Sequence, residues 1–118
     1  MHPDISRLPS KAFYDGRLRD GPEMAQKTVA PWHATSAFGT YRFFNVDSPE
    51  SSGGRRSVLN KGEVEAIINL YRSLRTLYGE SDGLFGRVGI VTPYKAQQME
   101  LRRVLRNYFG ERVFEEVE

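Results

Sequence analysis

The stretch 87–98 constrains the fold more than any other part of the sequence, because a short apolar run passes there into a helical pattern. Val88, Ile90 and Val91 are β-branched residues of the kind that fill buried strands. Pro93 ends the predicted strand, since proline cannot donate a hydrogen bond to a sheet ladder. Open α/β sheets bind ligands beyond the carboxyl ends of their parallel strands, so the turn after this strand is a candidate site.

Three polar side chains, those of Thr92, Tyr94 and Gln97, lie at this predicted edge. One interpretation makes them contacts to a substrate or partner. The other interpretation is structural: Thr92 caps the helix, Pro93 occupies its first turn and Tyr94 anchors it in the core. The residues alone favour the structural interpretation.

The sequence as a whole alternates between strand and helix patterns. We predict strands at 41–46, 87–91 and 113–118, and helices at 60–78 and 94–109. Asn60 and Glu63 form a capping-box pattern at the start of the first helix, and Leu101, Leu105 and Tyr108 belong to the apolar stripe of the second. This order predicts a parallel sheet with right-handed crossovers and flanking helices, as in a Rossmann-like or RecA-like half.

The other segments carry weaker patterns. We expect helical turns and an extended segment over 1–40, with two short turns in 3–14 separated at Pro9. Residues 48–59 are rich in Ser and Gly and are predicted to be a flexible loop.

A few residues in these segments have both a functional and a structural interpretation. Trp32 and His33 either stack on a base or hold an irregular segment in place, and the second interpretation is favoured. Arg55 and Arg56 either meet phosphate or form a solvated basic pair, which is the default. A metal-binding role for His2 is discarded, because the sequence places no His, Cys or acidic cluster near it.

Composition and absent motifs exclude several function classes. Seventeen Lys and Arg against 15 Asp and Glu give a net charge of +2, too small to indicate nucleic-acid or membrane binding by itself. The absence of cysteine fits an intracellular compartment, and no apolar run is long enough to span a membrane. The sequence has no phosphate loop, no dinucleotide-binding glycine motif, no acidic strand end for magnesium and no nucleophile elbow. We therefore predict no catalytic, ATP-binding or metal-binding residue in this chain.

Short motifs spread over the whole chain are similar, in consistent order, to those of one family. They are Met1-His2-Pro3-Asp4-Ile5, Leu8-Pro9-Ser10, Phe13-Tyr14, Gly16-Arg17-Leu18, Asp20-Gly21, Pro31-Trp32-His33, Tyr41-Arg42-Phe43-Phe44, Asn60-x-x-Glu63 and Gly89-Ile90-Val91-Thr92-Pro93-Tyr94-Lys95-x-Gln97. The chain resembles the second RecA-like domain of superfamily 1 helicases of the Upf type. Within that family it is most similar to the senataxin branch, the fungal transcription-termination helicases.

The resemblance implies that residues 1–118 are an internal part of the second RecA-like helicase domain, an incomplete half of a P-loop NTPase-type α/β fold. It implies an ATP-dependent RNA or DNA helicase that uses ATP and Mg²⁺ in its full-length form, with neither bound by this chain alone. It also implies a nuclear location, a first RecA-like domain as partner, and single-stranded RNA or DNA bound near the Thr92-Pro93-Tyr94 turn. With the functional interpretation of that turn, the residues expected to bind nucleic acid are Thr92, Tyr94 and Gln97. The alternative is a non-catalytic α/β interaction domain that keeps only the fold.

Overall fold

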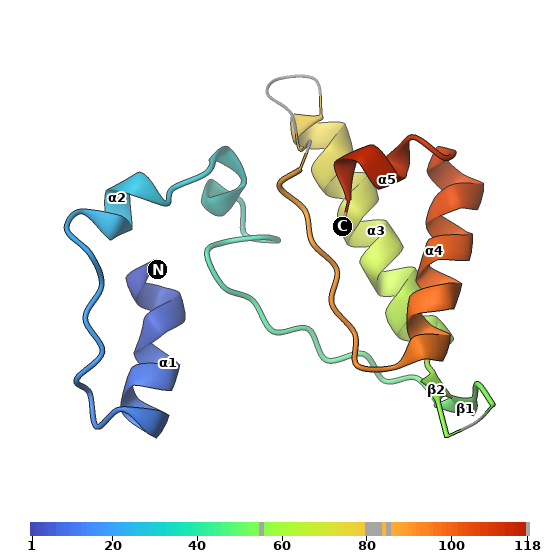
Figure 1. The fold of residues 1–118 in the computed structure, drawn as a ribbon. Coiled ribbons are helices and arrows are strands. Elements are labelled where there is room, and N and C mark those ends of the chain that lie inside the picture. The colour runs from blue at the N-terminus through green and yellow to red at the C-terminus, as the bar shows by residue number, and fades with distance from the viewer. Residues whose placement is uncertain (55, 80–83, 85, 118) are drawn as a thin grey trace. The chain divides into compact units, whose positions relative to one another are not determined.

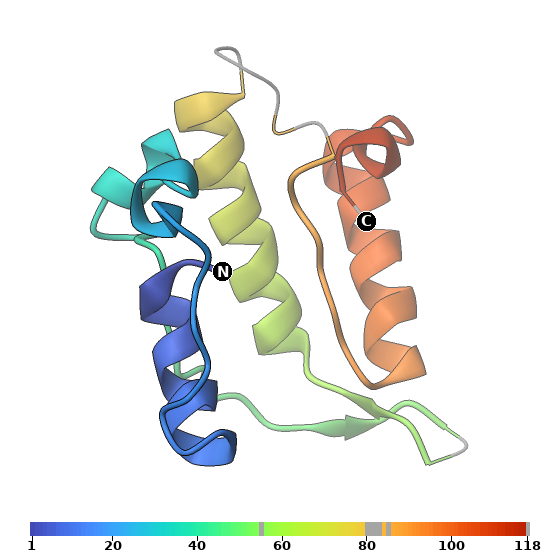
Figure 2. The same cartoon turned by 60° about the vertical axis from the view of Figure 1, so that its left-hand side comes forward.

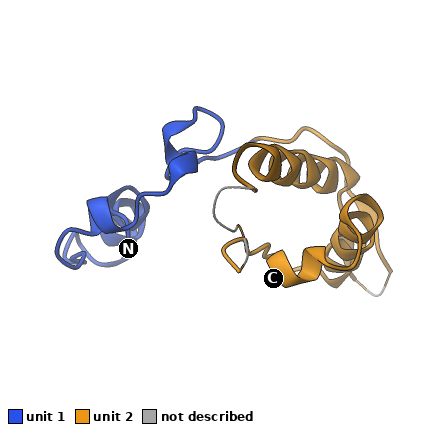
Figure 3. Cartoon of the chain, turned by 90° about the horizontal axis from the view of Figure 1, so that it is seen from above, with its two compact units in different colours: residues 1–44 blue, residues 45–118 orange. Residues whose placement is uncertain are grey.

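The structure, a computed structural model, describes residues 1–54, 56–79, 84 and 86–117. The chain divides into two compact units, an N-terminal unit of residues 1–44 and a C-terminal unit of residues 45–118 (Figure 3). Among the helices described, none has the length and apolar character needed to cross a membrane.

The N-terminal unit contains three helical segments (Figure 1). They are α1 (Pro3–Phe13), α2 (Met24–Lys27) and the 3-10 helix η1 (Pro31–Ala34). The predicted break at Pro9 is wrong, because α1 runs through this residue. An interior proline removes one backbone hydrogen bond from α1, and the N-terminus of the helix offsets this loss. There, His2 Nδ1 accepts the Asp4 N–H at 3.2 Å, and Pro3 occupies the first turn.

The predicted strand over 41–46 is also wrong, since these residues form neither helix nor strand. A strand needs a neighbour to bond its backbone, and β-propensity alone does not supply one. Phe43 is 82% exposed and Phe44 is 49% exposed, so these aromatic side chains are not packed as strand residues within the described chain.

The C-terminal unit is built from two long helices that lie side by side, α3 (Lys61–Tyr78) and α4 (Lys95–Phe109), with the short helix α5 (Val113–Glu116) against α4 (Figures 1 and 2). Before α3, the strands β1 (Ser51–Ser52) and β2 (Val58–Leu59) pair antiparallel as a small hairpin. The range 48–59 therefore contains regular structure, and its flexibility stays a prediction.

The core of the C-terminal unit lies between these helices. Its buried residues are Val64, Ile68, Tyr71, Leu101, Leu105, Val113 and Val117. The helix periodicity is confirmed, because the predicted stripes of α3 and α4 supply most of this set. Tyr108 is the exception: the residue is 62% exposed, and its ring lies under the guanidinium of Arg72, 5.1 Å from the ring centroid.

Only one bridge of a parallel sheet is formed by the described residues. Val88 pairs with Val117 in parallel, while residues 113–116 form α5 rather than the predicted strand, and Glu118 lies outside the described residues. A single bridge cannot hold two strands together, so residues 113–116 satisfy their backbone locally as a helical turn instead. Val91 is 96% exposed, so the described residues leave its side chain uncovered.

Tyr71 joins α3 to α5 through a buried hydroxyl. Its Oη donates to Glu116 Oε2 at 2.5 Å, and burial together with this carboxylate raises the pKa of the Tyr71 hydroxyl, so that it stays a donor well above neutral pH. Because the acceptor is charged, we expect Tyr71→Phe to lower the free energy of unfolding by about 1.5 kcal/mol, measured by urea denaturation. Tyr108→Phe is the control, since the exposed Tyr108 hydroxyl makes no hydrogen bond within the described chain. Equal effects of the two substitutions would contradict the account.

Candidate nucleic-acid interface

The helix α4 begins at a position that the structural interpretation of the sequence did not predict. Tyr94 is its N-cap and makes no side-chain capping bond. Thr92 lies two residues earlier, where its Oγ accepts the Tyr94 N–H at 3.3 Å, so its predicted role as N-cap is wrong. Pro93 precedes the helix, and Tyr94 is 45% exposed, so neither the first-turn proline nor the core anchor is observed.

The start of α4 offers hydrogen-bond donors to a ligand. Within the described chain, the backbone N–H groups of Lys95 and Gln97 make no hydrogen bond, as expected for the first turn of a helix. The Thr92 hydroxyl accepts a hydrogen bond and keeps its own proton to donate. α4 has 15 residues, and the positive end of its dipole lies at this turn. Together, the free donors and the helix dipole favour the binding of an anion at the first turn of α4.

Gln97, the third predicted site residue, is buried beneath the turn, with only 4% of its surface exposed. Its Oε1 accepts the Asn60 N–H at 2.9 Å, and its Nε2 donates to the Asn60 carbonyl oxygen at 3.2 Å and to Glu63 Oε2 at 3.1 Å. The amide is therefore committed to holding the start of α4 against the start of α3. The structure brings Thr92 and Tyr94 to the surface and places Gln97 inside.

This arrangement also corrects the capping box predicted for α3. Asn60 Oδ1 accepts the Glu63 N–H at 3.0 Å, so the N-cap is confirmed. The return bond from the Glu63 carboxylate to the Asn60 N–H is not made, because the Gln97 amide occupies that N–H. Glu63 accepts from Gln97 instead.

Two residues of the hairpin contribute to the site and were missed by sequence reasoning. Ser57 Oγ accepts the Ala96 N–H at 2.9 Å, which satisfies one donor in the first turn of α4. Gly53 packs so closely that an added Cβ would lie 2.1 Å from the Ala96 Cβ. The partners are about forty residues apart in the sequence, so no local pattern could have revealed them.

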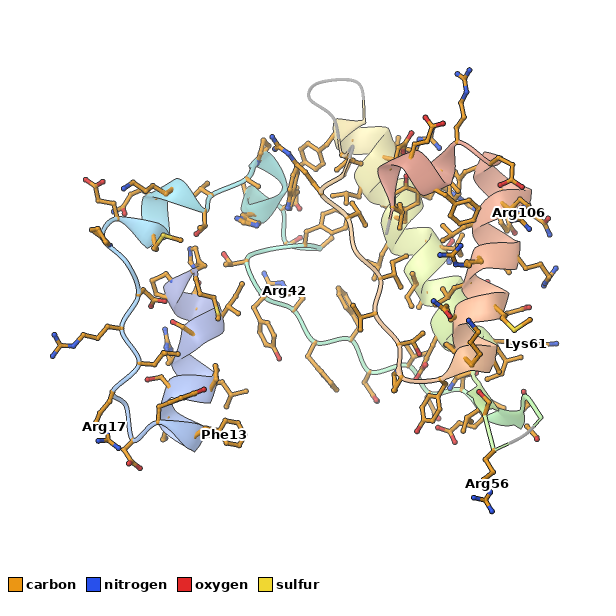
Figure 4. The ribbon with its side chains drawn as sticks, viewed as in Figure 1. Phe13, Arg17, Arg42, Arg56, Lys61 and Arg106 are labelled. Carbon is orange, nitrogen blue, oxygen red and sulfur yellow. The ribbon has the colours of Figure 1, made fainter. Side chains whose placement is uncertain are left out.

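The basic side chains of α4 beyond its first turn are largely engaged within the chain. Arg103 donates to both oxygens of Glu100, at 2.7 and 2.8 Å, and this pairing holds the pKa of the Glu100 carboxyl below its usual value. Arg106 pairs with Glu111, and Arg102 lies over the Phe114 ring. Figure 4 places Arg106 at the opposite end of α4 from Arg56 and Lys61. The Arg103 and Arg106 guanidinium groups are therefore already paired with carboxylates of the chain.

The other candidates from the sequence have structural partners in the N-terminal unit. His33 Nδ1 accepts the Ala30 N–H at 3.1 Å, and its ring meets the edges of Trp32 and His2 at centroid distances of 6.1 and 6.5 Å. Base stacking by Trp32 stays a prediction.

No group of three metal-ligating side chains is found among the residues that the structure covers. Of the basic pair predicted from the sequence, Arg55 lies outside the described residues.

Comparison with known proteins identifies the family. A family described as "AAA domain" matches residues 1–118, the whole chain. Helicase sen1 of Schizosaccharomyces pombe is 43% identical over 110 residues, covering 93% of this chain and 6% of the relative. Helicase SEN1 of Saccharomyces cerevisiae is 36% identical over 112 residues, 93% of this chain and 5% of the relative. The ATP-dependent helicase upf1 of Schizosaccharomyces pombe is 30% identical over 112 residues, 91% of this chain and 12% of the relative.

The chain belongs to this AAA domain family, among the Sen1-like and Upf1-like helicases of superfamily 1. It spans only about one-twentieth of the length of its two Sen1 relatives. The family match supports an α/β fold of the RecA-like type.

The buried amide of Gln97 provides a test of how the site is held. Gln97→Ala removes three hydrogen bonds and leaves the Asn60 N–H unsatisfied, so we expect the free energy of unfolding to fall by about 2 kcal/mol in urea denaturation. Gln98→Ala is the matched control. Gln98 is exposed, and among the described residues its amide bonds only to Lys95 Nζ, so its loss should change the free energy by less than about 0.5 kcal/mol. A Gln97→Ala effect as small as that of the control would show that the buried link is not formed.

Proposed function

We propose that this chain is part of an ATP-dependent helicase that couples ATP hydrolysis to translocation on single-stranded RNA or DNA, in RNA processing or transcription termination. The observation that carries the proposal is the similarity, over more than nine-tenths of the chain, to proteins named as helicases. A nuclear location and a first RecA-like domain as partner belong to the same proposal. The alternative of a non-catalytic interaction domain has no comparable support.

We assign the parallel RecA-like sheet to the full-length protein. The Val88–Val117 bridge has the parallel direction that this sheet requires, and it would be one rung between neighbouring strands. The exposed side chain of Val91 is then covered by the rest of that domain. ATP and Mg²⁺ act in the full-length protein, and no step of hydrolysis is assigned to a residue of this chain.

The role of this chain is to hold the phosphate backbone of the single strand. The Thr92 hydroxyl and the Lys95 N–H supply donors at the positive end of α4, and the exposed Tyr94 ring lies between them in the sequence. Gln97 acts from beneath as a positioning residue, because its amide fixes the first turn of α4 to Asn60. Phosphate contacts position a strand without reading its sequence, which suits an enzyme that moves along many sequences.

ATP turnover by the full-length protein tests the proposed activity. We expect hydrolysis that is stimulated by single-stranded RNA or DNA, because translocation couples the two. The 118-residue chain alone is the control and should show no turnover, since its sequence lacks the phosphate loop. A full-length protein that binds neither ATP nor single strands would favour the interaction-domain alternative.

The Thr92 hydroxyl gives a test of the site itself. Thr92→Val removes the hydroxyl at nearly constant volume, and loss of one uncharged phosphate hydrogen bond should weaken single-strand binding by roughly 1 kcal/mol, without a change in sequence preference. Thr92→Ser keeps the hydroxyl and is the control. Fluorescence anisotropy with the full-length protein measures both. If the Val and Ser variants bind and unwind equally well, Thr92 has only its local bond to the Tyr94 N–H.

A further inference from the structure

The hairpin before α3 is closed by its own backbone. Ser51 pairs with Leu59 and Ser52 with Val58, the Gly53 N–H donates to the Ser57 carbonyl oxygen at 2.8 Å, and the Ser57 N–H donates to the Gly54 carbonyl oxygen at 2.9 Å. These bonds define the course of the chain up to the tip. The hydrogen bonds of this short hairpin therefore fix the backbone on both sides of its tip.

This hairpin is fixed to the first turn of α4. Ser57 Oγ accepts the Ala96 N–H, and Gly53 leaves no space for a side chain against Ala96. Figures 1 and 2 show β1 and β2 beside the start of α4 in both views. The hairpin and the turn that carries Thr92 are therefore parts of one local structure within the C-terminal unit.

Arg56 lies at the tip of this hairpin, and no carboxylate of the described residues pairs with its guanidinium group. Its side chain is exposed, extends away from the unit in Figure 4, and makes no ion pair or hydrogen bond with the described residues. The arginines along α4 differ, since Arg103 and Arg106 pair with carboxylates. Arg56 also has a φ of +62°, a conformation that glycine adopts at no steric cost, so the turn accommodates an arginine at an unfavourable position.

We propose that the hairpin is a second element of the single-strand site, in which Arg56 forms an ionic contact with a backbone phosphate next to the one held at the start of α4. Ser57 and Gly53 are its positioning residues, because they hold the hairpin on Ala96. This inference rests on the proposed function and adds to it a charged contact. Thr92 and the helix N–H groups give uncharged hydrogen bonds, whereas Arg56 displaces a counterion from the strand.

Salt dependence separates these two kinds of contact. Each phosphate neutralised on a single strand contributes about 0.7 to the slope of log K against log salt concentration. For the full-length protein with a uridine oligonucleotide, Arg56→Gln should reduce the slope by about 0.7 and weaken binding about fivefold at 0.1 M salt, measured by anisotropy between about 50 and 200 mM salt. Thr92→Val should weaken binding and leave the slope unchanged.

Arg112→Gln is the matched control. Arg112 is also exposed and makes no ion pair within the described chain, but it lies beyond the C-terminal end of α4. At about 1.5 Å per residue, that helix separates it from the hairpin by roughly 20 Å. The slope for Arg112→Gln should equal that of the wild type.

The positioning role of Ser57 is tested by coupling. Ser57→Ala releases the hairpin from Ala96, so adding Arg56→Gln in that background should change the slope by much less than 0.7. Ser57→Thr keeps the hydroxyl and should restore the full effect. A slope that Arg56→Gln leaves unchanged, in a wild-type protein that binds single strands and hydrolyses ATP, overturns the hairpin proposal alone. A wild-type protein that does not bind single strands overturns it together with the proposed function.

Discussion

The amide of Gln97 is the interaction on which the rest of the C-terminal unit depends. It is buried, and it bonds to the N–H and the carbonyl of Asn60 and to the Glu63 carboxylate. A buried amide without partners costs free energy, so the position of each helix start is tied to that of the other. Because Asn60 also caps α3 and donates to the Ser48 carbonyl, the same link reaches the segment before the hairpin.

The two ends of the unit consequently differ in electrostatic character. At the hairpin end, the N-termini of α3 and α4 meet, and the positive ends of their dipoles lie near exposed donors and an unpaired Arg56. At the opposite end, cations are matched by carboxylates: Arg106 with Glu111, and Arg75 with Glu116 at 3.4 Å. A net charge of only +2 is compatible with the proposed local anion site, because several of the other arginines are paired with carboxylates.

Local patterns predicted the helices well and the sheet poorly, for a physical reason. The stripe through Val64 and Ile68, the Asn60 cap and the stop at Gly110 depend on residues within one or two turns, and all three are confirmed. Strand pairing depends on distant partners, and the expected strands at 41–46 and 113–118 lack them in the described chain. The candidate site shows the same difference. The surface position of Thr92 and Tyr94 follows from a local turn in the sequence, but the burial of Gln97 and the contact of Ser57 with Ala96 depend on partners more than thirty residues away.

The central claim is that this end of the unit is formed before the strand binds and that the Lys95 N–H is left free to bind it. Residue-resolved amide hydrogen exchange of the full-length protein, with and without single-stranded RNA, tests this most directly. The account predicts that the N–H groups of Asn60 and Ala96 are protected in the free protein, since Gln97 and Ser57 accept them, whereas the Lys95 N–H exchanges rapidly until RNA slows it. Rapid exchange of Asn60 in the free protein, or a Lys95 rate that RNA leaves unchanged, would contradict it.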